Sequence, residues 1–154
     1  MATQTSAVPA YLAALKAALD ARAIPLAEGE GTVLVTTAPS GAPVAPETIQ
    51  FFTVPATQGW AALGNRRKRE EFTVRGGLYV ELSGAGEEVA TAARERAYAL
   101  LAELEDALRL DPGVSFRVRQ SHLAEHELDQ GIAEGVRWAS LSFAIEAITE
   151  LTSN

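Results

Sequence analysis

The feature that most constrains the fold is the stretch 69–110, in which a strand pattern passes through a glycine turn into the longest helix pattern of the chain. Before the turn, apolar and polar residues alternate with the two-residue period of a strand that buries one face. The apolar members are Phe72, Val74, Leu78, Val80 and Leu82. Because Gly76-Gly77 interrupts this alternation, we expect a β-bulge there.

The helix of this stretch begins after the Ser-Gly-Ala-Gly turn at residues 83–86. Glu87 and Glu88 stand where acidic side chains stabilise the positive end of a helix dipole. Apolar residues then recur every three or four positions, at Val89, Ala93, Ala97, Leu100, Leu101, Leu104 and Leu108. Pro112 follows and cannot continue a helix. The stretch therefore predicts a strand with a long helix laid across its sheet.

The remaining segments extend this plan to a complete domain. An amphipathic helix enters near Pro9 and ends before Pro25, and strand patterns cover residues 32–37, 48–54, 60–63, 115–119, 122–128 and 137–150. Gly131 and Gly135 bracket a turn. We therefore expect one α+β domain over residues 1–154, with a mostly antiparallel β-sheet packed by two α-helices and a flexible tail at residues 1–7.

Size and composition exclude several classes of protein. A chain of 154 residues buries roughly two-thirds of its surface as one domain. Its net charge of −7 disfavours sequence-independent DNA binding, which needs a basic face. The absence of cysteine excludes disulfides and thiolate zinc sites. No apolar run approaches the roughly 20 residues that span a bilayer, and no signal-peptide pattern is present, so we expect a cytoplasmic protein without membrane contact.

Catalytic signatures are missing as well. Gly29-Glu30-Gly31 lacks the third glycine of a dinucleotide site, and no phosphate-loop pattern or nucleophile with a base can be placed. His122 and His126 would share a metal if they lay on one face, but nothing identifies a third ligand, and a solvated polar strand is the simpler interpretation. We expect no enzyme activity, no cofactor and no metal site.

Two segments are candidates for contacts with other molecules. Pro39, Pro43 and Pro46 lie in an extended loop, and loops of this length are often binding elements. Arg66, Arg67, Lys68 and Arg69 form a dense basic run. This run is either a solvated loop or a contact with an acidic surface, on a neighbouring subunit or on nucleic acid.

Residues beside the basic run add further candidates. Glu70 and Glu71 point to opposite faces of a strand, so we expect them to pair with basic residues of another subunit rather than to act as an acid–base pair. Trp60, Trp138, Phe51 and Phe52 belong in the core by default. Phe51 and Phe52 cannot both face one core from a single strand, and Phe52 is our candidate for an interface.

The run Gly-Asn-Arg-Arg-Lys-Arg-Glu-Glu-Phe-Thr-Val at residues 64–74 resembles the strand entry of tail terminator proteins of long-tailed, siphovirus-like bacteriophages, particularly those of actinobacterial hosts. The helix segments at residues 92–97 and 101–108, the stop at residues 110–112 and the long last strand are similar too. The resemblance extends from the first helix to Ile148, as a pattern of elements and short motifs.

This resemblance implies a structural virion protein. Proteins of that family form a hexameric ring that caps the finished tail tube, ends its polymerisation and provides the surface for head–tail joining. The implied partners are further copies of the chain, the major tail tube protein and the head–tail connector or neck proteins, while DNA passes through the lumen without specific binding. The implied location is the neck-proximal end of the tail, after assembly in the host cytoplasm.

The candidate contact residues in such a ring are Pro39, Pro43, Pro46, Phe52, Arg66, Arg67, Arg69, Glu70 and Glu71. Two alternatives stay open. The chain could be another neck, head-completion or minor tail protein, which a tube-capping activity would separate from a terminator. It could also be a small ligand-binding α+β module whose sheet and helices enclose an apolar pocket, which would act as a monomer.

Overall fold

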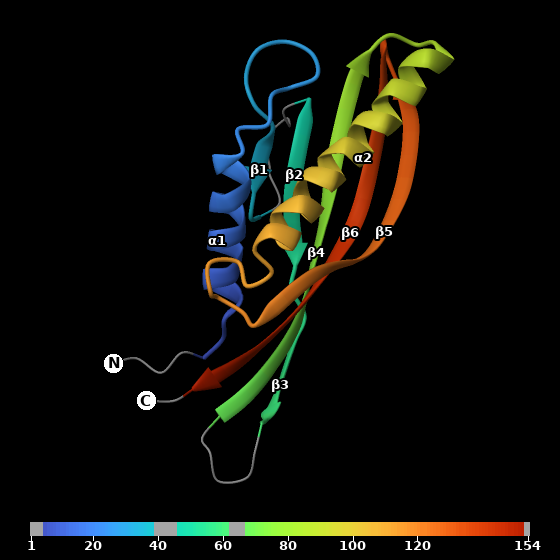
Figure 1. Ribbon diagram of the computed structural model, residues 1–154. Helices are drawn as coiled ribbons and strands as arrows, with labels where there is room; N and C mark the ends of the chain where they lie inside the picture. Colours follow the sequence, from blue (N-terminus) through green and yellow to red (C-terminus); the bar gives the residue numbers. More distant parts are fainter. Residues whose placement is uncertain (1–4, 39–45, 62–66, 153–154) are drawn as a thin grey trace.

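The computed structural model describes residues 5–38, 46–61 and 67–152, and it places two helices on one six-stranded sheet (Figure 1). The helices are α1 (Val8–Ala21) and α2 (Glu87–Leu110). The strands are β1 (Leu34–Thr36), β2 (Glu47–Thr53), β3 (Ala56–Trp60), β4 (Arg67–Ser83), β5 (Gln120–Ala133) and β6 (Val136–Thr152). The fold is α+β, as the sequence predicts.

Two long strands form the centre of the sheet. Its order is β1-β2-β4-β6-β5, and β3 pairs with the first part of β4. Only the β1–β2 pairing is parallel; β2–β4, β3–β4, β4–β6 and β5–β6 are antiparallel. β4 and β6 pair without interruption along their whole lengths, from Arg67 opposite Thr152 to Ser83 opposite Val136. β2, β3 and β5 all pair with one of these two strands.

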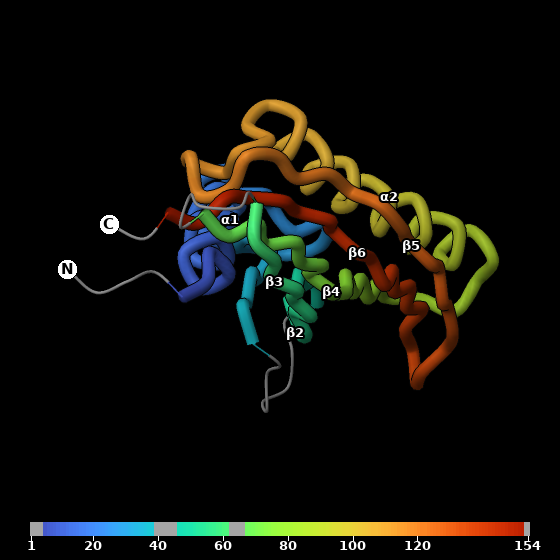
Figure 2. Tube along the Cα trace, turned by 90° about the horizontal axis from the view of Figure 1, so that it is seen from below, coloured from blue at the N-terminus to red at the C-terminus, as the bar shows by residue number. Residues whose placement is uncertain are grey.

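Both helices bury their apolar stripes against the same face of the sheet. α2 packs on β4, β6 and β5, and in Figure 2 it runs alongside β6 and β5. α1 packs against β1 and α2, and its Tyr11 ring meets the ring of Phe72 edge to face at 5.2 Å. The resulting core is continuous, with Leu15, Ile49, Phe51, Val74, Leu78, Ala97, Leu100, Leu104, Leu141 and Ile145 almost fully buried.

The bulge predicted at Gly76-Gly77 is wrong, because β4 keeps its regular alternation through both glycines. The irregularity lies opposite, in β2, between Phe51 and Thr53. Gly76 is needed for packing: a Cβ there would stand 2.3 Å from the carbonyl oxygen of Gln50 and 2.5 Å from the Phe143 ring. The aromatic ring occupies the space that a side chain at Gly76 would fill.

Three other expectations need correction. Residues 115–119 form a turn instead of a strand, since Val114, Ser115 and Phe116 adopt left-handed φ angles of 45°, 55° and 60°. The short strand expected at residues 60–63 lies at β3, ending at Trp60. Of the tail expected at residues 1–7, Ala7 is buried in the core and hydrogen-bonded, whereas residues 1–4 lie outside the described residues.

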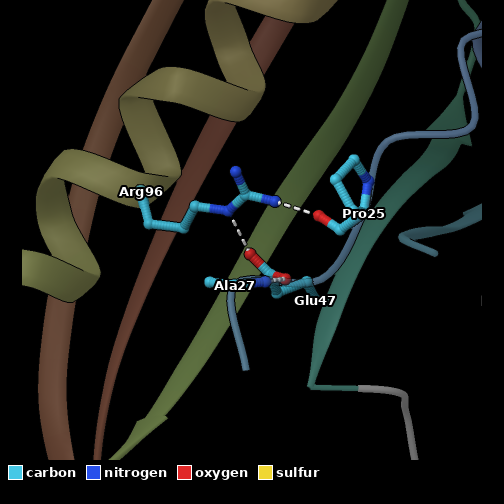
Figure 3. A network of polar contacts seen from close by, with 4 residues as sticks. All are labelled: Pro25, Ala27, Glu47 and Arg96. Atoms are coloured by element: carbon cyan, nitrogen blue, oxygen red, sulfur yellow. Dashed lines mark hydrogen bonds and ion pairs between the residues drawn. The ribbon is translucent and has the colours of Figure 1, made fainter. Parts of the chain in front are cut away.

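One buried ion pair fastens α2 to the start of β2 (Figure 3). The carboxylate of Glu47, which is 1% exposed, accepts from Nε of Arg96 and from the backbone N–H of Ala27 at 2.7 Å. The same guanidinium donates to the carbonyl oxygen of Pro25 at 2.6 Å. These bonds hold the segment after α1 against α2 and the start of β2.

Among the described residues, no helix is long and apolar enough to cross a membrane.

Candidate functional site

One end of the sheet, the end that carries β3, is exposed. This strand pairs with β4 from Ala56 opposite Phe72 to Trp60 opposite Lys68, and it lies beyond the lower ends of both helices (Figure 1). We call β3 together with residues 67–71 the arm. All five β3 residues are exposed, and Trp60 is 72% exposed. The expectation that Trp60 belongs to the core is therefore wrong.

The outer edge of β3 has the composition of a pairing surface. Its residues Ala-Thr-Gln-Gly-Trp include no charge and no proline, and no strand pairs with this edge in the described parts of the chain. Native edge strands usually carry charges or prolines that prevent pairing with other chains. β5, the edge strand on the opposite side of the sheet, follows that rule with Glu125, Glu127 and Asp129. β3 does not, so its backbone is open to a partner.

Basic side chains stand next to this edge. Nη1 of Arg67 lies 3.9 Å from a carboxylate oxygen of Glu150, and Nη2 of Arg69 lies 2.7 Å from Glu71. All four side chains are about half exposed, and such surface ion pairs stabilise a protein by only about 0–1 kcal/mol. The two arginines can therefore exchange these partners for acidic groups of another molecule at little cost.

Glu70 has a different role from the one expected. It is fully buried; Oε1 accepts from the backbone N–H of Ala7 at 2.7 Å and Oε2 accepts from Nε2 of Gln58 at 2.5 Å. The carboxylate thus sits at the start of α1, where the helix dipole favours negative charge. Glu70 joins the arm to the start of α1 within the subunit, and its buried side chain is not available for contact with another subunit. Glu71 faces the opposite side and stays exposed, as the strand alternation predicts.

The face of the sheet opposite the helices, which we call the open face, holds the second candidate surface. Phe52 lies on it and is 48% exposed, whereas Phe51 is 1% exposed in the core. The expectation that only one of the two phenylalanines faces the core is confirmed. The other open-face residues of the central strands include Gln50, Arg75, Gly77, Tyr79, Glu81, Trp138, Ser140 and Ser142.

The open face is hollowed over β2, β4 and β6. The hollow measures about 580 Å³, and small residues line it at Gly77, Ser140 and Ser142. Phe52 leans over Gly77, where a Cβ would stand 3.2 Å from its ring. Near the other end, the ring of Tyr79 stacks on Trp138 with centroids 6.3 Å apart. The hollow therefore has a floor of small residues and an aromatic rim.

Carboxylates border this hollow. Glu127 is the cross-strand partner of Ser142, and Asp129 is the partner of Ser140, so both share the open face with the serines. Glu81 lines the hollow directly. Burial, and to a lesser extent the charge of Glu81, raises the pKa of the Tyr79 hydroxyl. Within the described ranges none of the three carboxylates forms an ion pair, and the hollow is an acidic and aromatic surface.

The two histidines lie on different faces of β5. A register shift between Leu123 and Glu125 breaks the alternation. Nε2 of His122 lies 3.5 Å from a carboxylate oxygen of Glu146, whereas the His126 ring meets Tyr98 of α2 edge to face at 5.5 Å. The shared-metal arrangement considered for this pair is therefore not formed.

Of the three proline candidates, Pro46 lies among the described residues. Pro46 is exposed, and its carbonyl oxygen accepts from the backbone N–H of Glu81 at 2.9 Å. Pro39, Pro43 and Arg66 lie outside the described residues. The arm thus brings Arg67, Arg69 and Glu71 together at one end of the sheet, while Phe52 lies on the open face.

Sequence reasoning missed the hollow and the exposure of Trp60. The sequence does contain a signal for the hollow. In β6 the small residues Ser140 and Ser142 alternate with core residues, and Gly77 lies opposite Ser142 in β4.

The chain matches no protein-family model and no curated protein. Its function is therefore inferred from these surfaces and from the resemblance of the sequence pattern.

Proposed function

We propose that the protein is a structural subunit of the ring that caps the tail tube of a long-tailed bacteriophage, ends tube polymerisation and provides the surface for head–tail joining. The observation on which the proposal rests is the uncharged, exposed β3 edge with Trp60 at its end. Such an edge favours association with other chains. A closed ring of identical subunits covers each lateral surface once and leaves none free.

The composition of the chain agrees with this role. Each subunit contributes a net charge of −7, and an acidic lumen repels DNA and lets it pass without adhering. The partners in this proposal are further copies of the chain, the major tail tube protein and the connector or neck proteins. The site of action is the neck-proximal end of the tail, after assembly in the host cytoplasm.

Tube growth in the presence of the protein tests the proposal. Purified major tail tube protein of the same phage is allowed to polymerise with and without the chain, and tube lengths are measured by electron microscopy. A terminator shortens the tubes in proportion to its concentration and appears as a ring at one tube end. Tubes of unchanged length, with no protein at their ends, would refute the proposal.

The hollow on the open face supports a second candidate, a module that binds small molecules, because its volume lies in the range of ligand sites. The alternative drawn from the sequence has an apolar pocket between the sheet and the helices, whereas this hollow lies on the face of the sheet away from the helices. Saturable binding of a small aromatic compound by a strict monomer, with no effect on tube growth, would favour this candidate over the terminator.

A further inference from the structure

We propose that Trp60 and Lys68 of the arm insert into the hollow on the open face of a neighbouring copy of the same chain. This inference rests on the proposed function, because it names the contact that joins one ring subunit to the next.

The shapes of the two surfaces are complementary. Trp60 projects from the end of β3, and Nζ of Lys68 lies 5.6 Å from the centre of its ring, so the two side chains form one aromatic and cationic unit. The hollow of about 580 Å³ is large enough for an indole and a lysine side chain. Its aromatic rim, with Phe52 and Tyr79, offers the edge-to-face and stacked contacts that indoles make.

The charges are complementary as well. Lys68 stands on the same face of the arm as Trp60, its cross-strand partner, and Arg67 and Arg69 flank it on the opposite face of the strand. The hollow presents Glu81 at its wall, with Glu127 and Asp129 beside its serines. Arg75 also lies on this face, at the Phe52 end of the hollow, next to Ala144 and Thr53. A cationic arm is attracted to the acidic end, and this attraction fixes its orientation on the open face.

The contact cannot form within one chain. Trp60 pairs with Lys68, which pairs with Leu151 of β6, whereas Ser142 lies nine residues away on the same strand (151 − 142). At the rise of a β-strand this separation is about 30 Å. Arm and hollow are also different surfaces, so each copy donates one and receives the other. Such head-to-tail contacts produce rings when the rotation between copies closes.

Cysteine cross-linking tests this contact directly, because the chain has no cysteine of its own. Ala61→Cys beside Trp60 and Ser142→Cys in the hollow are combined in one chain, and thiols are joined with a short bismaleimide in the presence of tube protein. We expect a ladder of cross-linked products that extends past the dimer. The matched control combines Ala61→Cys with Ala99→Cys, since Ala99 is exposed on α2, on the other side of the sheet. It should give no ladder.

Adding Trp60→Ala to the cross-linking pair should lower the yield of the ladder about tenfold, as expected when a central aromatic anchor is removed. Lys68→Glu or Glu81→Lys alone should also weaken it, and the combination should restore it. A ladder that stops at the dimer, or an equal ladder from the Ala99→Cys control, would overturn the contact.

Mass measurement of the chain without added cysteines, under the same conditions, separates the two claims. A ring on the tube, without a ladder from the Ala61→Cys and Ser142→Cys pair, overturns this contact and leaves the proposed function standing. A strict monomer that never binds the tube overturns both.

Discussion

The backbone N–H of Ala7 donates a 2.7 Å hydrogen bond to Oε1 of Glu70, 63 residues further along the chain. The carboxylate therefore joins the start of the first helix to the arm, of which Glu70 is a part. Its second oxygen accepts from Nε2 of Gln58 in β3, so one buried side chain links β3, β4 and the start of α1.

Glu70→Gln should destabilise the protein by about 1–3 kcal/mol, because the new amide places a donor against a donor inside the protein. Chemical denaturation followed by circular dichroism measures this difference. The control is Glu71→Gln, which changes only an exposed pair with Arg69 and should cost less than about 1 kcal/mol. Equal effects of the two substitutions would contradict the role assigned to Glu70.

Arg96→Met should reduce the free energy of unfolding by roughly 3–5 kcal/mol, because it leaves the carboxylate of Glu47 buried without its cation. Arg109→Met is the matched control, since it removes an arginine of the same helix from an exposed pair with Glu105. The control should stay within about 1 kcal/mol of the wild type. A loss below about 1 kcal/mol for Arg96→Met would show that the pair contributes little to the fold.

Gly76→Ala should be among the most destabilising small substitutions in the chain. The added methyl group would overlap the carbonyl oxygen of Gln50 and the Phe143 ring, and overpacking of this kind costs about 1–3 kcal/mol or more. Gly59→Ala makes the same chemical change in β3, where nothing lies within 4 Å. Thermal unfolding should show a clear loss for the first variant and almost none for the second.

Stability should fall as the pH rises from about 10 to about 12. Burial raises the pKa of Tyr11 from 10.0 to about 12, with a smaller opposing effect of the Ser121 hydroxyl. In this range the unfolded chain releases the phenolic proton while the folded chain retains it, so the contribution of about 3 kcal/mol is complete below pH 10 and lost above pH 12. Tyr11→Phe should lack this component when denaturation is compared across the same range. Identical pH profiles would contradict it.

Charge reversal in the arm, Arg67→Glu with Arg69→Glu, should weaken assembly without unfolding the subunit. Both side chains are more than half exposed and form only surface ion pairs. The control reverses two other exposed arginines at the same spacing, Arg117→Glu with Arg119→Glu, in the turn after α2. Sedimentation measures assembly, and circular dichroism confirms the fold. Unchanged tail joining by the arm variant would remove the contact role of the two arginines.

The sequence predicted those elements whose signal is local. The 24 residues of α2 carry an unbroken apolar stripe between an acidic start and a proline, and the predicted helix agrees with the structure. The alternation of apolar and polar residues in β4 and β6 likewise predicts strands, and the structure contains both. Where a partner strand decides the geometry, local reasoning failed: Gly76 is explained by Phe143, which lies 67 residues later (143 − 76).

The candidate surfaces were only partly predictable for the same reason. The basic run and the Phe51-Phe52 pair are visible in the sequence, and the structure places Arg67, Lys68, Arg69 and Phe52 on exposed surfaces. The burial of Glu70 depends on Ala7, and the exposure of β3, which ends at Trp60, follows from its position beyond the ends of the helices (Figure 1). The sequence around residues 114–116 has the alternation of a strand, but the backbone there turns. The Asp111 carboxylate accepts a hydrogen bond from the backbone N–H of Ser115 and closes this turn.

The most direct test of the central claim is the mass of the purified protein in solution, measured by light scattering over a range of concentrations, alone and with its tail tube protein. A subunit of a terminator ring should give a species of about six chains, either alone or only when tube protein is present. A strict 16.3 kDa monomer at every concentration, with no association with the tube, would contradict the account.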